Sequence, residues 1–211
     1  MPCIWVLAGT NGAGKSSIGG ELLRRSGGDY FNPDEVAKLL RAKDPSLTVR
    51  QANVSAWRAG VRLLDDAIRA GREHFFETTL GGATITAKLE SAIDAGFDVR
   101  IWYVGLASVE LHLARVALRV ARGGHDIPEA DIRRRFDNSR RNLIRLTPRL
   151  AELKLFDNST DAEVLGGALP EPLLLLHLLG NQVIELAEPA ACPEWAKPII
   201  AAALRRPEAG R

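Results

Sequence analysis

The residues best placed to do chemistry form one short loop near the N-terminus. Residues 9–16 read Gly-Thr-Asn-Gly-Ala-Gly-Lys-Ser and match the pattern G-x-x-x-x-G-K-[ST] at every required position. In this pattern the backbone N–H groups of a glycine-rich turn wrap a polyphosphate where a helix begins, and the positive end of the helix dipole favours the negative charge. The loop therefore predicts a nucleoside triphosphate site.

Three residue types in this loop carry the expected chemistry. Gly12 and Gly14 let the backbone approach the phosphates, because side chains there would block that approach. Lys15 is expected to reach the β- and γ-phosphates as a point charge, and the Ser16 hydroxyl to bind the Mg²⁺ that bridges them. The residues expected to contact the triphosphate are Gly9, Thr10, Asn11, Gly12, Ala13, Gly14, Lys15, Ser16 and Ser17.

A carboxylate follows the second predicted strand, which spans residues 29–31. Asn32 can cap the helix that comes next and Pro33 suits its first position, so Asp34 lies in the opening turn. In a small kinase this is where a substrate hydroxyl is held, and a positioned aspartate can act as acceptor and base for it. Asp34 can equally serve only to complement the helix dipole, and the sequence leaves both readings open.

A third candidate cluster ends the next strand, where residues 75–80 read Phe-Phe-Glu-Thr-Thr-Leu. Polar side chains at the carboxyl end of a strand usually face a ligand or its metal in an open α/β sheet. Glu77 is a candidate for contact with Mg²⁺ water or substrate, and Thr79 for a hydrogen bond to substrate. The alternative is a threonine-rich cap for the following helix.

Arginines concentrate in the segment from 115 to 149. Three of them lie at helical spacing on one face, namely Arg115, Arg119 and Arg122. A Gly-Gly joint at 123–124 separates this helix from a second basic helix, which is how a lid over a triphosphate would be built, so residues of about 109–147 form the predicted lid. Arginines 133–135 are consecutive and point in different directions, so they cannot all reach one site.

Asn158 follows the last predicted parallel strand. If the sheet has the usual kinase order, the adenine should lie nearby, and Asn158 would read the edge of the base. A simple turn or cap at 157–159 is the competing explanation.

Alternating strand and helix patterns must position these residues, and they predict a parallel sheet with helices on both faces. Strands are expected at residues 3–8, 29–31, 74–77, 99–104 and 153–156, and helices at 15–25, 33–42, 48–70, 83–95, 109–122 and 128–146. A hairpin around Gly180-Asn181 and a helix from Pro193 follow. The predicted fold class is α/β: a P-loop NTPase or kinase-like three-layer sandwich with a central, mainly parallel sheet, a helical lid and a C-terminal hairpin and helix. We expect a single domain over residues 1–211, with the C-terminal extension at about 160–211.

Composition limits the function classes. The 28 basic and 26 acidic residues leave a net charge of +2, so nucleic acid is an unlikely partner for the chain as a whole. The two cysteines, Cys3 and Cys192, are too few and too distant to indicate a disulfide framework or a metal site. The longest apolar run, residues 173–179, is far too short to span a bilayer, and no signal segment opens the chain. We therefore expect a cytoplasmic protein without a membrane partner.

Together these motifs resemble the zeta-toxin family of P-loop kinases, particularly its short stand-alone branch often described as a predicted ATPase. The resemblance is carried by the phosphate loop, Asn32-Pro33-Asp34, Glu77-Thr78-Thr79, Arg119 with Gly123-Gly124-His125 and Pro128, and Asp157-Asn158. These motifs cover roughly the first three quarters of the chain, and their order and spacing are more specific than any one of them.

The resemblance implies ATP and Mg²⁺ as cofactors and phosphorylation of a sugar hydroxyl. In the best known members this is the 3′-hydroxyl of the amino sugar in UDP-N-acetylglucosamine, and an antitoxin protein is a possible partner. By position Asp34 would be the catalytic base, Lys15 the γ-phosphate lysine and Arg119 the first catalytic lid arginine. Glu77 and Thr79 match an E-x-T motif of the substrate and metal pocket.

Two positions depart from the family pattern. His125 stands where the toxins carry a second lid arginine, and we assign it to the substrate pocket. Arg122, which we assign to ATP binding, or one of Arg134 and Arg135 can take the place of that arginine. Gly60 and Val61 stand where characterised toxins present a substrate-binding glutamate.

Two other function classes remain open on the sequence. A kinase acting on a nucleoside, an antibiotic hydroxyl or a polynucleotide end would use the same loop and the same aspartate. A non-kinase ATPase module is less favoured, because no hydrophobic strand ends in an Asp-Glu pair and residues 80–82 lack the serine and glutamine of a transporter signature.

Overall fold

The structure, a computed structural model, describes residues 1–25, 27, 30–160 and 171–205, without the side chains of 17, 21, 23 and 25. Its strands are β1 Cys3–Ala8, β2 Tyr30–Phe31, β3 His74–Thr78, β4 Asp98–Gly105, β5 Glu152–Asp157, β6 Leu173–Leu179 and β7 Gln182–Leu186. Its α-helices are α1 Ser16–Arg25, α2 Pro33–Lys43, α3 Val49–Ala70, α4 Ala83–Asp94, α5 Val109–Ala121, α6 Glu129–Leu146 and α7 Lys197–Leu204.

Within the described ranges the strands form one seven-stranded sheet in the order β2-β3-β1-β4-β5-β6-β7. The first five strands are parallel, whereas β6 pairs antiparallel with β5 and β7 pairs antiparallel with β6. The predicted α/β fold with a mainly parallel sheet is therefore confirmed. The C-terminal hairpin pairs with β5 and so continues the central sheet.

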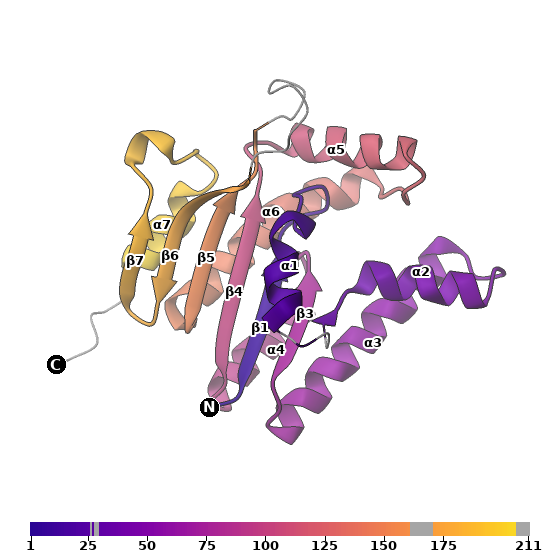
Figure 1. Cartoon of the computed structure of the whole chain (residues 1–211), viewed down its shortest axis with the longest axis horizontal. Coiled ribbons are helices and arrows are strands. Elements are labelled where there is room, and N and C mark those ends of the chain that lie inside the picture. The colour runs from indigo at the N-terminus through magenta and orange to yellow at the C-terminus, as the bar shows by residue number, and fades with distance from the viewer. Residues whose placement is uncertain (26, 28–29, 161–170, 206–211) are drawn as a thin grey trace.

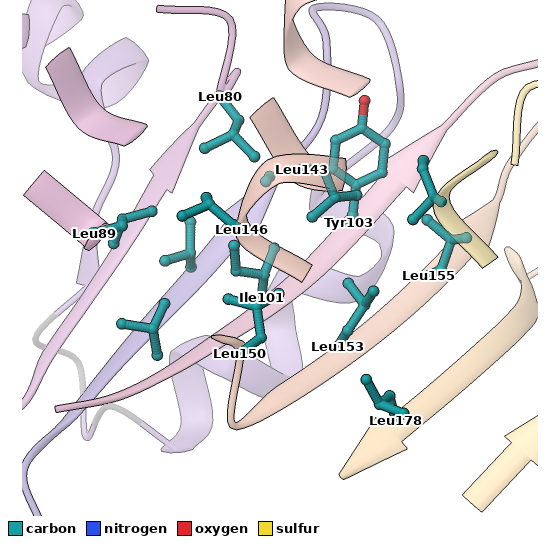
Figure 2. Close-up of a cluster of buried hydrophobic side chains, with 14 of the residues drawn as sticks. Leu80, Leu89, Ile101, Tyr103, Leu143, Leu146, Leu150, Leu153, Leu155 and Leu178 are labelled. Carbon is teal, nitrogen blue, oxygen red and sulfur yellow. The ribbon is translucent and has the colours of Figure 1, made fainter. Parts of the chain in front are cut away.

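Side chains that alternate along the strands build two cores, one on each face of the sheet. In β1, Ile4 and Val6 belong to the larger core, whereas Trp5 and Leu7 belong to the smaller one. Helices α4, α6 and α7 cover the larger core, and α1 covers the smaller one, as Figure 1 shows. Figure 2 shows the leucine-rich centre of the larger core, with Ile101 and Tyr103 of β4 facing α6.

Most predicted element boundaries hold to within a few residues. Asp29, predicted as the start of the second strand, lies outside the described residues, as do residues 161–170 and 206–211 of the predicted C-terminal extension. The helix predicted to begin at Pro193 begins at Lys197, because the preceding residues form a turn closed by a hydrogen bond from the N–H of Ala196 to the carbonyl oxygen of Pro193.

Two helical hairpins flank the carboxyl ends of the strands. In Figure 1, β4 and β5 point to the top of the view, where α5 lies, and α2 and α3 project to the right. Asn32 caps α2, since its side chain accepts hydrogen bonds from the N–H groups of Asp34 and Glu35. None of the described helices is long and apolar enough to cross a membrane.

Candidate active site

The phosphate loop connects β1 to α1 and adopts a backbone that requires glycine. Gly12 and Gly14 have φ of 82° and 81°, in the left-handed region that side chains disfavour. A Cβ at Gly12 would lie 2.8 Å from the carbonyl oxygen of His112, and one at Gly14 would lie 2.3 Å from Nδ2 of Asn158. These glycines therefore serve the packing of the loop against its neighbours in addition to the access for phosphates that the sequence predicts.

Lys15 of the phosphate loop lies beside Glu77 of β3, 62 residues later in the sequence. The buried ammonium of Lys15 donates a 2.8 Å hydrogen bond to the carbonyl oxygen of Gly9 and lies 3.4 Å from Oε1 of Glu77. Parallel pairing of β1 with β3 produces this meeting, because it sets Leu7 beside Glu77. Lys15 is thus fixed beside a carboxylate at the carboxyl edge of the sheet.

The other oxygen of Glu77 is held by two donors, one from β2 and one from the N-cap of α2. Oε2 of Glu77 accepts hydrogen bonds from the Tyr30 hydroxyl at 3.2 Å and from Nδ2 of Asn32 at 3.1 Å. Burial raises the pKa of Tyr30, and the adjacent Glu77 carboxylate acts in the same direction, so Tyr30 stays a neutral donor. Sequence reasoning missed Tyr30 here, because only strand pairing sets it beside Glu77.

The donor set of the loop fits a magnesium-bound triphosphate. Ser16 is exposed at the start of α1, and the first turn of that helix contains no acidic side chain that would oppose a phosphate. Each carboxylate oxygen of Glu77 has two lone pairs, so its existing partners leave acceptor capacity for a metal-bound water. Ser16 and Glu77 are accordingly the residues that would hold Mg²⁺.

Asp34 lies where α2 and the lid approach each other. Its carboxylate oxygens lie 3.9 Å from Nη1 of Arg119 and 3.9 Å from Nε2 of His125. Nη2 of Arg119 also donates to the carbonyl oxygen of His125 at 3.2 Å, so the joint at Gly123-Gly124 folds back over the arginine. Burial lowers the pKa of His125, with Arg119 acting in the same direction and Asp34 opposing it. The structure thus brings together three residues that the sequence predicted.

The three consecutive lid arginines point in different directions, as predicted. Arg133 bonds Glu129 and Glu110, and Arg134 pairs with Asp131. Arg135 alone of the three reaches the phosphate loop, where Nη1 donates to Oδ1 of Asn11 at 2.7 Å. Its side chain packs against Gly81, at which a Cβ would lie 2.9 Å from Cγ of Arg135.

The structure says less about the other residues predicted to contact the triphosphate. Arg122 is exposed at the C-terminal end of α5 and is not among the residues that line the pocket. Nδ2 of Asn158 donates to the carbonyl oxygen of Ala13 at 2.9 Å, so its amide holds the backbone of the loop. Thr10 is buried in the loop, and the side chain of Ser17 lies outside the described residues.

A buried histidine ties the lid to the loop, and sequence reasoning missed it. Nδ1 of His112 lies 2.8 Å from the carbonyl oxygen of Asn11, to which it donates, and the ring packs edge-on against Phe136 of α6. Burial lowers the pKa of His112 to about 4, so the ring is neutral at physiological pH. Helices α5 and α6 are therefore attached to the phosphate loop through one side chain.

A pocket of about 260 Å³ opens between the phosphate loop, α2, α3 and the lid. It takes in Asp34, Glu77, Thr79 and His125, which are the four residues predicted to bind substrate. One wall of the pocket comes from α3 and consists of Asn53, Trp57, Gly60 and Val61. The sequence analysis singled out Gly60 and Val61 but missed Asn53 and Trp57. In the sequence these four residues are marked only by their spacing of four, three and one positions, which places them on one face of a helix. Any helix with an apolar stripe has such a spacing, so it could not identify a pocket wall.

Comparisons with known proteins agree with this arrangement. A family model described as Zeta toxin matches residues 1–167. An uncharacterised protein of Haemophilus influenzae is 32% identical over 144 residues, which make up 63% of this chain and 96% of that protein.

Solved structures share the fold at low identity. AvrRxo1-ORF1, solved in complex with AvrRxo1-ORF2 and ATP, has a TM-score of 0.65 and 17% identity over all of this chain, which spans 65% of that chain's length. The PezAT toxin-antitoxin system of Streptococcus pneumoniae has a TM-score of 0.53 and 16% identity over 74% of this chain and 68% of that chain. At these identities the likeness concerns the fold alone.

Proposed function

The chain belongs to the zeta-toxin family of P-loop kinases, and on that premise we propose that it transfers the γ-phosphoryl group of ATP to a hydroxyl of a small molecule held in the pocket. The observation that carries the proposal is that Glu77, which lies beside Lys15, and Asp34, which lies beside Arg119, line one pocket at the phosphate loop. The pocket thus offers the Asp34 carboxylate to an acceptor hydroxyl, in addition to the Glu77 carboxylate beside Lys15.

In the proposed reaction the acceptor oxygen attacks the γ-phosphorus, and a new O–P bond forms as the bond to the β–γ bridging oxygen breaks. ADP leaves, and the hydroxyl proton passes to a carboxylate oxygen of Asp34. Because the transition state of phosphoryl transfer is loose, Asp34 orients the hydroxyl before it accepts the proton. A magnesium ion held at Ser16 and Glu77 would supply charge neutralisation on the transferring group.

The remaining residues supply charge and orientation. Lys15 reaches the γ-phosphate from its position beside Glu77. Arg119 places its guanidinium beside Asp34 and Arg135 places its own on Asn11 of the phosphate loop, and a planar fork suits the oxygens of a transferring phosphoryl group. Arg135 takes the part of the second lid arginine in this proposal, because it contacts the loop directly.

The finer assignment follows the resemblance. The acceptor would be a UDP-N-acetylamino sugar such as UDP-N-acetylglucosamine, the enzyme would act in the cytoplasm, and an antitoxin would bind it. An antitoxin partner is supported by the PezAT system and by the AvrRxo1-ORF1:ORF2 complex, and ATP by the ATP complex of the latter.

Incubation with Mg-ATP and a panel of UDP-sugars, nucleosides and RNA ends, followed by mass spectrometry, tests the proposal. We expect a phosphate adduct on one hydroxyl compound and none with Lys15→Ala, which removes the γ-phosphate contact. ATP turnover that is unchanged by every acceptor would instead indicate a non-kinase ATPase.

A further inference from the structure

One pocket residue has no part in the phosphoryl-transfer chemistry described above. Trp57 lines the pocket from α3 and is 47% exposed. The other three tryptophans of the chain, Trp5, Trp102 and Trp195, are 8%, 1% and 5% exposed and pack in the two cores. Trp57 therefore presents an aromatic ring to the pocket, where the others serve the interior.

Trp57 is not needed to hold α3 in place. Helices α2 and α3 pack through small side chains, Ala37 on the first and Ala52 and Ala56 on the second. Leu64 attaches α3 to the larger core under the sheet. Within the described part of the chain, Trp57 belongs to none of the buried hydrophobic clusters.

The pocket wall beside Trp57 is apolar. Gly60 follows one helical turn later, and a Cβ there would lie 2.5 Å from Cε1 of Phe31, so the phenyl ring packs directly on the helix backbone. The Phe31 ring thus takes the place of a side chain at Gly60, and Phe31 and Val61 line the pocket together with Trp57. Asn53, one turn before Trp57, adds a side chain that can both donate and accept hydrogen bonds.

The size of the pocket limits what can lie on this wall. A volume of about 260 Å³ is just below the ~300–1,000 Å³ typical of small-molecule sites, which suits one ring with its substituents. Asp34 lines the same small pocket as Trp57. A ring placed on the α3 wall is therefore close to the carboxylate that receives the acceptor hydroxyl.

We propose that Trp57 is the acceptor platform of this kinase: its ring stacks on the flat face of the ring that carries the reacting hydroxyl, with Asn53 bonding a ring substituent. The proposal rests on the proposed function for the identity of the reacting group. Stacking on an aromatic face favours any ring with an apolar face, so the acceptor class is a cyclic hydroxyl compound such as a sugar.

Kinetics with the acceptor identified by the panel provide the first test. Trp57→Ala should raise the KM for the acceptor at least ~10-fold and leave the KM for ATP within about 2-fold, whereas Trp57→Phe should restore most of the acceptor affinity. Val54→Ala is the matched control, because Val54 is an exposed apolar residue of α3 that does not line the pocket. An unchanged acceptor KM in Trp57→Ala would overturn the proposal.

Fluorescence gives a second test that does not depend on turnover. Acrylamide, an uncharged quencher, should reach Trp57 and be excluded from the three buried tryptophans, so Trp57→Phe should remove most of the quenching. N-acetylglucosamine, UDP-N-acetylglucosamine and uridine are then added singly to the wild type.

Protection from acrylamide by N-acetylglucosamine, or by UDP-N-acetylglucosamine when uridine gives none, supports the platform, even if no phosphate adduct forms and the proposed function fails. Protection by uridine without protection by N-acetylglucosamine would show that a base, and not the reacting ring, occupies the wall, and would overturn the assignment. No protection by any of the three, or protection that survives in Trp57→Phe, would also overturn the assignment.

Discussion

Protonation of His112 should destabilise the protein as the pH falls below neutrality. This residue is buried between α5 and the phosphate loop, where its Nδ1 donates to the carbonyl oxygen of Asn11. Burial lowers its pKa from 6.5 to about 4, against the opposing effect of the bond to Asn11, and the positive charges of Lys15 and Arg115 act in the same direction as burial.

The sign and size of the effect follow from the two pKa values. Because the folded pKa lies below the unfolded one, the unfolded chain binds the proton first as the pH falls. The contribution of neutral His112 to the free energy of unfolding is complete above pH 6.5 and is lost as the pH falls towards about 4. At 1.36 kcal/mol per pH unit the whole interval corresponds to about 3 kcal/mol, of which about 2 kcal/mol is lost by about pH 5.

Urea unfolding of the wild type and of His112→Asn at about pH 7.5, 6 and 5 measures this contribution. Asparagine keeps an N–H donor near the position of Nδ1 and does not titrate, so the other titrating groups cancel in the difference between the two proteins. We expect the stability gap at pH 7.5 to narrow by about 2 kcal/mol at pH 5. A gap that stays constant to within ~0.5 kcal/mol would refute the assignment of a strongly lowered pKa to His112.

Three further substitutions test the site and the fold. Asp34→Asn should lower phosphoryl transfer at least ~10²-fold with ATP binding nearly intact, because a positioned base is lost; a large fall in Tm with unchanged turnover would reduce Asp34 to a helix cap. Arg119→Lys should lower kcat more than it raises the KM for ATP, because the planar guanidinium fork acts in the transition state. Arg145→Lys is the control and should change both constants little, because Arg145 bonds Glu90 on the surface. Equal small effects at both positions would argue against a catalytic lid. Gly105→Ala should lower the free energy of unfolding in urea by ~1–3 kcal/mol, because the new Cβ would lie 2.3 Å from Cη2 of the buried Trp195. Gly20→Ala is the control and should not destabilise the protein, because its Cβ would meet only the side-chain end of Arg24 at 3.8 Å. Equal stabilities of the two variants would show that the Trp195 contact is loose.

The fold and the outline of the site were predictable because their signals are local. The glycine spacing, the apolar run before it and the Asn32-Pro33 helix start each lie within a few residues, and backbone geometry responds to such patterns directly. The predicted α/β fold was confirmed on this basis. The contact of Asp34 with Arg119 and His125 was not predicted from the sequence, because it depends on how the chain folds back at the Gly-Gly joint that follows α5.

Contacts between distant segments were beyond the reach of those signals. Arg135 and Asn11 are 124 residues apart and Asn158 and Ala13 are 145 apart, and their hydrogen bonds follow from the packing of α6 and the pairing of β5. The sequence made Arg122, Arg134 and Arg135 alternative candidates for the second lid arginine. Arg134 and Arg135 both lie beside Asp131, and of these two it is Arg135 that also bonds Asn11 of the phosphate loop.

By itself, the sequence determined the phosphate loop, the order of strands and helices and the positions of Lys15 and Asp34, because hydrogen bonding and side-chain periodicity within a segment specify these. Only the tertiary structure decided which side chains share a pocket. Strand register set Glu77 beside Lys15, and the docking of α3 turned Trp57 towards the pocket that also contains Asp34. Register and docking depend on the simultaneous packing of the whole core, which no short window of sequence contains.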